Sequence, residues 1–172
     1  TQTAGAPAQA AAGLSGMKIA YVEIDTLLAK YNFCIDLNEA MVKKSENVRL
    51  TLNQKAKELD KQKQEFQTKY QNNAYLSQER AQQEYNRIAK LEQDLQALSN
   101  KLQSELMSEN DKNSLQLRDS INAFLKEYNK TKGYSLIISN TGFDNLLYAD
   151  SVYNITKEIL DGLNARYSSP KK

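Results

Sequence analysis

The sequence has no histidine, no tryptophan and a single cysteine, Cys34. Without histidine, no imidazole can act as the base of a Ser/His/Asp or Cys/His nucleophile, and one cysteine can form neither a four-ligand zinc site nor an intrachain disulfide. The six glycines never fall in a nucleotide-binding pattern. The sequence therefore predicts a protein that is not an enzyme, with no catalytic residue, no metal site and no cofactor.

An excess of charge of one sign is also missing, because 23 basic side chains stand against 21 acidic ones, a net charge of +2. Nucleic-acid-binding domains usually carry a clear basic excess, so we expect no nucleic-acid partner. No run of 18 apolar residues occurs, and no basic-plus-apolar secretory signal is visible. These absences predict a soluble chain that binds neither DNA nor RNA.

Proline and glycine are absent from Met17 to Lys132, a stretch dominated by Gln, Asn, Lys, Glu and Leu. So long a stretch without a helix breaker predicts long helices. The residues before it, 1–17, carry no charge and too few large apolar side chains to form a core, so we expect a flexible lead-in.

Strand patterns lie on both sides of the helical stretch. Residues 18–25, KIAYVEID, are apolar on both faces near their start, which is typical of a central strand, and a short helix is predicted around 26–31. Residues 134–140, YSLIISN, are rich in β-branched residues and predict a second strand, and 146–149, LLYA, predict a short third one.

A last helix is predicted after the third strand. Asp150 and Ser151 offer N-cap side chains, and apolar residues then recur every three or four positions, at Val152, Ile155, Ile159, Leu163 and Tyr167. We expect this helix to pack on the sheet. The fold class is therefore α+β, mostly α: a small β-sheet body with a C-terminal helix, from which a long antiparallel α-helical hairpin projects as a coiled-coil arm.

The hairpin prediction rests on the register of two apolar stripes. Asp36 and Glu39 resemble a capping box at the start of the first helix, while Asn72, Asn73 and Ser77 indicate a helix stop and a new N-cap. If the chain turns near 73–77, the two helices run antiparallel, and the residue numbers of two facing residues should add up to a nearly constant value. Apolar residues do face each other in this way, since the numbers add up to 150 for Leu59 with Leu91 and to 151 for Phe66 with Tyr85. The predicted arm seam consists of Val48, Leu52, Leu59, Phe66, Leu91, Leu95, Leu98 and Leu102.

The register also sets the expected domain boundaries. The hairpin arm is predicted over 36–114, and the body over 18–35 and 115–168, where Leu117, Ile121, Phe124 and Tyr128 should dock. Asn110 and Asn113 interrupt the apolar stripe, which indicates either a hinge between arm and body or a solvated helix face. Apolar residues off the seam are the candidates for loose contact with many clients: Leu50, Tyr75, Leu76 and Met107.

The opening KIAYVEID and TLLAKY, the hairpin without Gly or Pro, and the ending YSLIISN…LLYADSVYNITKEILDGLNARY together resemble the Skp/OmpH family of periplasmic chaperones over residues 18–167. The resemblance implies a jellyfish-like homotrimer in which strands of three chains form a central trimerisation body and the arms enclose a cavity. In that cavity, unfolded outer-membrane β-barrel proteins are held without ATP. Candidate body residues for the trimer contact are Ile19, Val22, Ile24, Leu136 and Ile138.

The resemblance also implies a periplasmic location, with a signal peptide removed upstream, and the uncharged lead-in is compatible with a lipid-anchored N-terminus. Cys34 would then be an unpaired thiol in an oxidising compartment, so we expect it to be buried. Residues 43–112 depart from the strongly basic arms often found in the family, because they hold 13 Lys/Arg against 11 Asp/Glu. We therefore expect only weak contact with membrane surfaces and assign no lipopolysaccharide site.

Two other classes share some of these features. A coiled-coil scaffold or adaptor would have the same hairpin but would bind one defined partner and have no evident use for the split sheet. A prefoldin-like cytosolic chaperone also carries helical arms on a β body, and an upstream signal peptide would exclude it.

Overall fold

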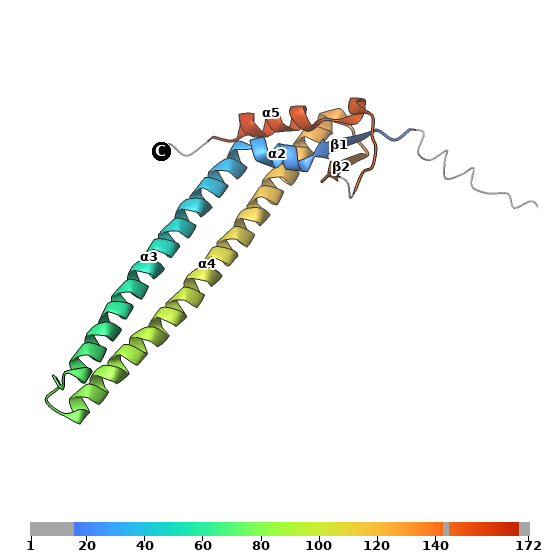
Figure 1. The fold of residues 1–172 in the computed structure, drawn as a ribbon. Coiled ribbons are helices and arrows are strands. Elements are labelled where there is room, and N and C mark those ends of the chain that lie inside the picture. Colours follow the sequence, from blue (N-terminus) through green and yellow to red (C-terminus); the bar gives the residue numbers. More distant parts are fainter. Residues whose placement is uncertain (1–15, 143–144, 169–172) are drawn as a thin grey trace, which may run out of the picture. The chain divides into compact units, whose positions relative to one another are not determined.

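The computed structural model describes residues 16–142 and 145–168, so most of the predicted lead-in, 1–17, lies outside the described residues. The chain divides into two compact units. One, here called the body, comprises the chain up to Asn38 and from Ser114 onward; the other, here called the hairpin, is Glu39–Asn113. Two long helices, α3 (Asn32–Gln71) and α4 (Gln78–Lys132), each contribute to both units (Figure 1).

The sheet of the body joins two strands from distant parts of the sequence. β1 (Ile19–Glu23) pairs in parallel with β2 (Leu136–Asn140), with Ile19 opposite Leu136 and Glu23 opposite Asn140. The other edge of β1 is also occupied, since the N–H of Ile155 donates to the carbonyl oxygen of Tyr21 at 3.0 Å. β1 therefore lies between two partners, as its apolar residues on both faces indicate.

The predicted third strand at 146–149 is wrong. Residues 145–149 form no strand, and the side chains of Leu147 and Tyr148 are 78% and 84% exposed. The free edge of β1 is taken instead by residues 154–156, where the hydroxyl of Thr156 accepts a hydrogen bond from the N–H of Glu23 at 2.8 Å. The composition of LLYA is typical of a strand, but the sheet edge that it would pair with is occupied by residues 154–156.

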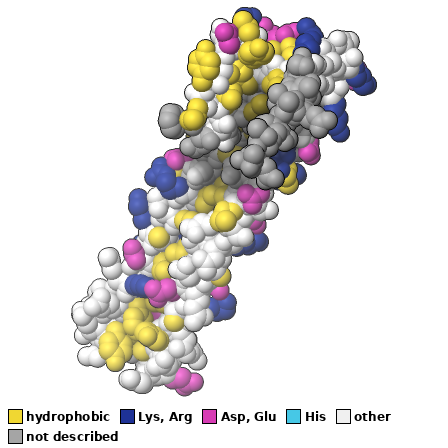
Figure 2. All heavy atoms as spheres, turned by 90° about the vertical axis from the view of Figure 1, so that its right-hand side faces the viewer, with side chains coloured by type: hydrophobic (Ala, Val, Ile, Leu, Met, Phe, Trp, Pro, Cys, Tyr) yellow, Lys and Arg dark blue, Asp and Glu magenta, His cyan; other side chains and the backbone are white. Residues whose placement is uncertain are grey.

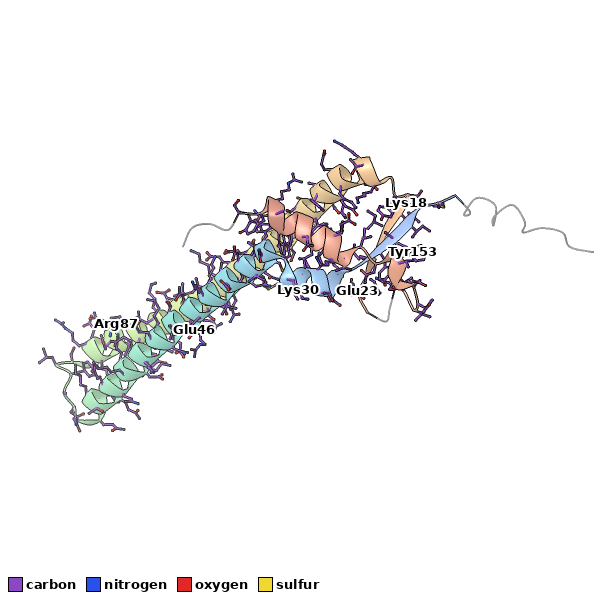
Figure 3. The ribbon with its side chains drawn as sticks, turned by 90° about the horizontal axis from the view of Figure 1, so that it is seen from above. Lys18, Glu23, Lys30, Glu46, Arg87 and Tyr153 are labelled. Carbon is purple, nitrogen blue, oxygen red and sulfur yellow. The ribbon has the colours of Figure 1, made fainter. Side chains whose placement is uncertain are left out.

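The start of α3 also differs from the prediction. A short helix, α2 (Ile24–Lys30), runs between Glu23 and Lys30 (Figure 3), and α3 begins directly after Tyr31. Asp36 consequently lies inside α3 and is not an N-cap. Its carboxylate accepts a hydrogen bond from the hydroxyl of Tyr167 at 2.9 Å, a contact between residues 131 positions apart that no local pattern reveals.

The last helix, α5 (Thr156–Arg166), starts later than predicted. Asp150 does cap a helix, because it accepts from the N–H of Val152 at 3.0 Å, but this helix is the 3-10 turn η1 (Ser151–Tyr153). Val152 is exposed as a result and is not part of the stripe. The rest of the stripe packs inward, and the body core consists of Ala20, Val22, Leu27, Tyr31, Cys34, Ile155, Ile159 and Leu163.

The C-terminal part of α4 closes this core. Leu117, Ile121, Phe124 and Tyr128 pack against it, which confirms the predicted docking. Cys34 is buried, as expected, and burial raises the pKa of its thiol.

The hairpin consists of the remaining parts of α3 and α4, which run antiparallel and are joined by residues 72–77 (Figure 1). Asn73 adopts a φ of 53°, a conformation that asparagine tolerates better than most residues. The hydroxyl of Ser77 accepts a hydrogen bond from the N–H of Arg80 at 3.2 Å, which confirms the predicted N-cap of α4.

Candidate binding surfaces

The facing sides of α3 and α4 in the hairpin are joined by a few contacts. Phe66 and Tyr85 were predicted to face each other, and their ring centroids lie 6.1 Å apart. Lys63 forms an ion pair with Glu92 at 2.8 Å, and Lys44 forms another with Glu109. These contacts connect the helices along the hairpin.

The seam between these contacts is only loosely filled. Of the eight predicted seam residues, Leu59 is buried and the other seven are half-buried. An open hollow of about 200 Å³ lies between the helices, lined in part by Leu59, Leu91, Leu95 and Leu98. A close-packed protein interior leaves few voids larger than a water molecule, and this hollow is much larger. The seam therefore has apolar surface that side chains of another molecule can contact.

The four predicted client-contact residues lie at three separate places. Leu76 is 93% exposed in the loop, and Tyr75 beside it is half-buried because its ring packs on Phe66 at 5.6 Å. Leu50 on α3 and Met107 on α4 are both exposed. At about 1.5 Å per residue, Leu50 lies roughly 30 Å from the loop end of its helix and Met107 roughly 45 Å. Only Tyr75 and Leu76 are brought together.

Two further exposed aromatics lie near the loop, and neither is among the eight predicted seam residues, although Tyr85 was expected to face Phe66. Tyr70 and Tyr85 are 51% and 56% exposed, because the seam ends there and no third layer covers them. The ring of each lies near that of Phe66, with centroid distances of 5.9 Å for Tyr70 and 6.1 Å for Tyr85. Figure 2 shows hydrophobic side chains gathered at this end of the hairpin. The nearness of aromatics to a predicted turn was the signal that could have indicated their exposure.

Charged side chains of the hairpin largely neutralise one another. Arg49 pairs with Glu46, and Arg87 pairs with Glu84 at 2.6 Å. Each arginine lowers the pKa of its glutamate, mainly through the hydrogen bond. Exposed pairs of this kind contribute little to stability. They leave a polar surface without a strong field of either sign.

The body also exposes several large apolar side chains. Leu136, Leu147, Tyr148, Val152 and Tyr153 are all exposed. Of the predicted trimer-contact residues, Leu136 is therefore at the surface, while Ile19, Ile24 and Ile138 are half-buried. Val22 is buried in the core of its own chain.

The body also contains a groove of about 630 Å³. It is lined mainly by aliphatic side chains of α2, β2 and the C-terminal part of α4, among them Leu28, Ile137, Leu117, Ile121 and Leu125. Its size falls in the range of ligand pockets, but its lining holds a single charged side chain, Arg118. Such a groove suits apolar side chains better than a polar substrate.

No group of three or more His, Cys, Asp or Glu side chains in residues 16–142 and 145–168 is arranged to hold a metal ion. In the same residues, no helix is both long and apolar enough to cross a membrane. Asn110 is exposed and Asn113 half-buried, and α4 continues through both as regular helix, so the hinge there stays a prediction.

Comparison with known proteins gives two findings. The family model described as outer membrane protein (OmpH-like) matches residues 18–163. The crystal structure of an OmpH-like protein from Caulobacter crescentus is similar to this structure, with a TM-score of 0.78 at 13% sequence identity, and the match covers 100% of this chain and 94% of that one. Among curated proteins, no match was found. At so low an identity the structural match supports the fold, and the family model, which spans most of the chain, establishes the family.

Proposed function

We propose that this chain, which belongs to the OmpH-like family of outer membrane protein chaperones, is a holdase that works without ATP. It binds unfolded outer-membrane β-barrel proteins and prevents their aggregation in the periplasm. The observation that carries the proposal is the hairpin itself: exposed apolar side chains spread along a polar, nearly neutral pair of helices with a loosely filled seam.

Spread-out apolar contacts suit a client that has no fixed shape. Leu76 lies roughly 30 Å or more from Leu50 and Met107 along the hairpin, so these side chains can contact different segments of an extended polypeptide. Each contact is worth only about 1.5–3 kcal/mol even if the side chain becomes fully buried. Binding therefore depends on many weak contacts, and release needs no nucleotide.

We further propose that three copies assemble through the body. Leu136, Tyr148 and Val152 are exposed, and the body also has a groove lined mainly by aliphatic side chains. Burying such apolar surface against another copy is the usual reason for a symmetric oligomer. Three hairpins around one axis would enclose a space in which a client is shielded from other clients. The proposed trimer supports the same function, since a single two-helix hairpin cannot surround a polypeptide.

The aggregation of an outer-membrane β-barrel protein diluted out of urea tests the holdase function. Light scattering should fall when the protein is present, equally with and without ATP. A variant with Leu50→Gln, Leu76→Gln and Met107→Gln should suppress aggregation several-fold less, because its contact surface is polar. Glutamine has a high helix propensity, so α3 and α4 should still form in this variant.

The matched control carries Gln54→Ala, Gln64→Ala and Gln67→Ala, three exposed positions on α3 that are already polar. It should suppress aggregation like the parent protein. The proposed function is wrong if the parent protein does not reduce scattering. It is also wrong if the variant with three glutamines suppresses aggregation as well as the control variant with three alanines.

A further inference from the structure

The loop end of the hairpin contains a small hollow, here called the tip pocket. It has a volume of about 220 Å³ and lies between the last turns of α3 and the first turns of α4. Its lining consists of Phe66, Tyr70, Gln78, Ala81, Gln82 and Tyr85. Small-molecule pockets usually begin at about 300 Å³, so the tip pocket is large enough for one side chain and too small for a cofactor.

We propose that the tip pocket binds one aromatic side chain of an unfolded polypeptide. This inference rests on the proposed holdase function and adds the class of side chain that the hairpin end selects. Aromatic rings prefer offset or edge-to-face contact with other rings, and such pairs contribute beyond the area that they bury. Phe66, Tyr70 and Tyr85 provide three ring walls for that contact.

The aromatic walls are held in place before any ligand arrives. Phe66 is in ring contact with Tyr70, Tyr75 and Tyr85, at centroid distances of 5.6 to 6.1 Å. Ala81 is buried at the base of the hollow, where a larger side chain would fill the space. A pocket with fixed walls loses little conformational freedom on binding, which favours one well-placed ring over a flexible aliphatic chain.

The polar groups that line the tip pocket also favour an uncharged aromatic side chain. None of its six lining residues carries a formal charge, so an ionic group would lose its hydration without gaining a counter-charge. The side-chain nitrogen of Gln82 donates to Asn86 at 3.0 Å, which leaves its carbonyl oxygen able to accept a hydrogen bond. The hydroxyl of tyrosine or the indole N–H of tryptophan can supply that donor.

A tryptophan-containing peptide gives a direct assay, because the protein itself has no tryptophan. The probe is the capped, uncharged peptide Gly-Ser-Trp-Ser-Gly, whose emission should shift to the blue and saturate as the full-length protein is added. A peptide with leucine in place of tryptophan should compete at least tenfold more weakly. Equal competition by the leucine peptide would overturn the proposal.

Two variants locate the binding at the tip pocket. Ala81→Leu fills the hollow, and Tyr85→Ala removes one wall at a position that is 56% exposed. Each should weaken peptide binding at least fivefold. The control Gln83→Leu adds the same leucine at an exposed neighbouring position outside the lining and should leave binding unchanged. If Tyr85→Ala binds the peptide like the parent, the tip pocket is not the site.

Two further measurements separate this proposal from its rivals. Peptide binding should change less than twofold between 50 and 500 mM NaCl, and a tenfold loss would show an ionic site and overturn the proposal. A protein carrying Tyr75→Trp should keep its emission unchanged with phosphatidylcholine vesicles, whereas a blue shift with vesicles and none with a tyrosine peptide would assign the tip to a lipid surface. If suppression of client aggregation persists without saturable peptide binding, the tip-pocket inference fails and the holdase function stands.

Discussion

The side chain of Asn164 in α5 bridges the break between α2 and α3. Its amide oxygen accepts a hydrogen bond from the backbone N–H of Asn32 at 2.9 Å, and its amide nitrogen donates to the backbone carbonyl of Lys30 at 3.1 Å. The end of one helix and the start of the next are thus satisfied by one residue more than 130 positions away.

Replacing this residue should therefore destabilise the body. We expect Asn164→Ala to lower the free energy of unfolding by about 1–2 kcal/mol, the usual loss for a removed helix cap. Urea unfolding followed by circular dichroism, at one fixed protein concentration, measures the change. The control Asn53→Ala, at an exposed position on α3, should change stability by less than about 0.5 kcal/mol. Equal stability of the two variants would mean that the bridge contributes nothing.

A second prediction concerns Gly162 in α5. A Cβ atom at this position would lie 2.2 Å from Cζ of Phe124, so the Phe124 ring must move if alanine is introduced. Although alanine favours helix over glycine by about 1 kcal/mol, we expect Gly162→Ala to destabilise the protein by about 1–3 kcal/mol through overpacking. Thermal unfolding of the single variant tests the sign.

The double variant Gly162→Ala with Phe124→Leu separates the clash from other causes. Leucine vacates the space that the ring occupies, so the alanine should cost less in this background than in the parent. If the alanine is equally harmful with and without the Phe124→Leu substitution, the ring contact is not the reason for the glycine.

The third prediction is a loss of stability at alkaline pH. The Tyr128 hydroxyl is buried beside the Glu158 carboxylate without a well-formed hydrogen bond, and burial followed by the nearby negative charge raises the pKa of this phenol well above its ordinary value. The protonated phenol is therefore favoured by folding. Its contribution is complete below pH 10.0, the value for an unperturbed tyrosine, and is lost as the pH rises through the higher pKa of the folded state.

Tyr128→Phe removes this titration. The variant should match the parent near pH 7, since it also removes a buried hydroxyl that lacks a good partner. Between pH 9.5 and 11.5 its melting temperature should fall less than that of the parent. Parallel curves for the two proteins would show that Tyr128 does not titrate differently on folding.

The fourth prediction concerns salt. The charges of the hairpin are nearly balanced, and several are paired within one helix, as for Arg49 with Glu46 and Lys90 with Asp94. Client binding through apolar side chains should then weaken less than threefold between 50 and 500 mM NaCl. A loss of tenfold or more, measured with a fluorescently labelled unfolded client, would mean that electrostatic capture dominates.

Much of the helical architecture could be predicted because its causes are local. The absence of glycine and proline up to Lys132 favours long helices, and Ser77 provides the chemistry of an N-cap. The antiparallel register, in which the numbers of facing residues add up to 150 or 151, paired Phe66 with Tyr85, whose rings are in contact. Each of these features depends on residues within a few positions of each other or on simple helix geometry.

The errors come from contacts between residues that are far apart in sequence. Asp36 looked like an N-cap but accepts a hydrogen bond from Tyr167, and the helix starts earlier because Asn164 satisfies the N–H of Asn32. LLYA looked like a strand, but Thr156 and Ile155 occupy the sheet edge that it would need. The exposure of Tyr70 and Tyr85 depends on what covers the seam, which periodicity does not describe.

The most direct test is native mass spectrometry of the protein alone and after addition of an outer-membrane β-barrel protein diluted out of urea. The proposed function predicts a trimer that takes up one unfolded client and retains it without nucleotide. A monomer or dimer that leaves the client to aggregate would contradict the holdase function, and a coiled-coil scaffold with one defined partner would then be the better explanation.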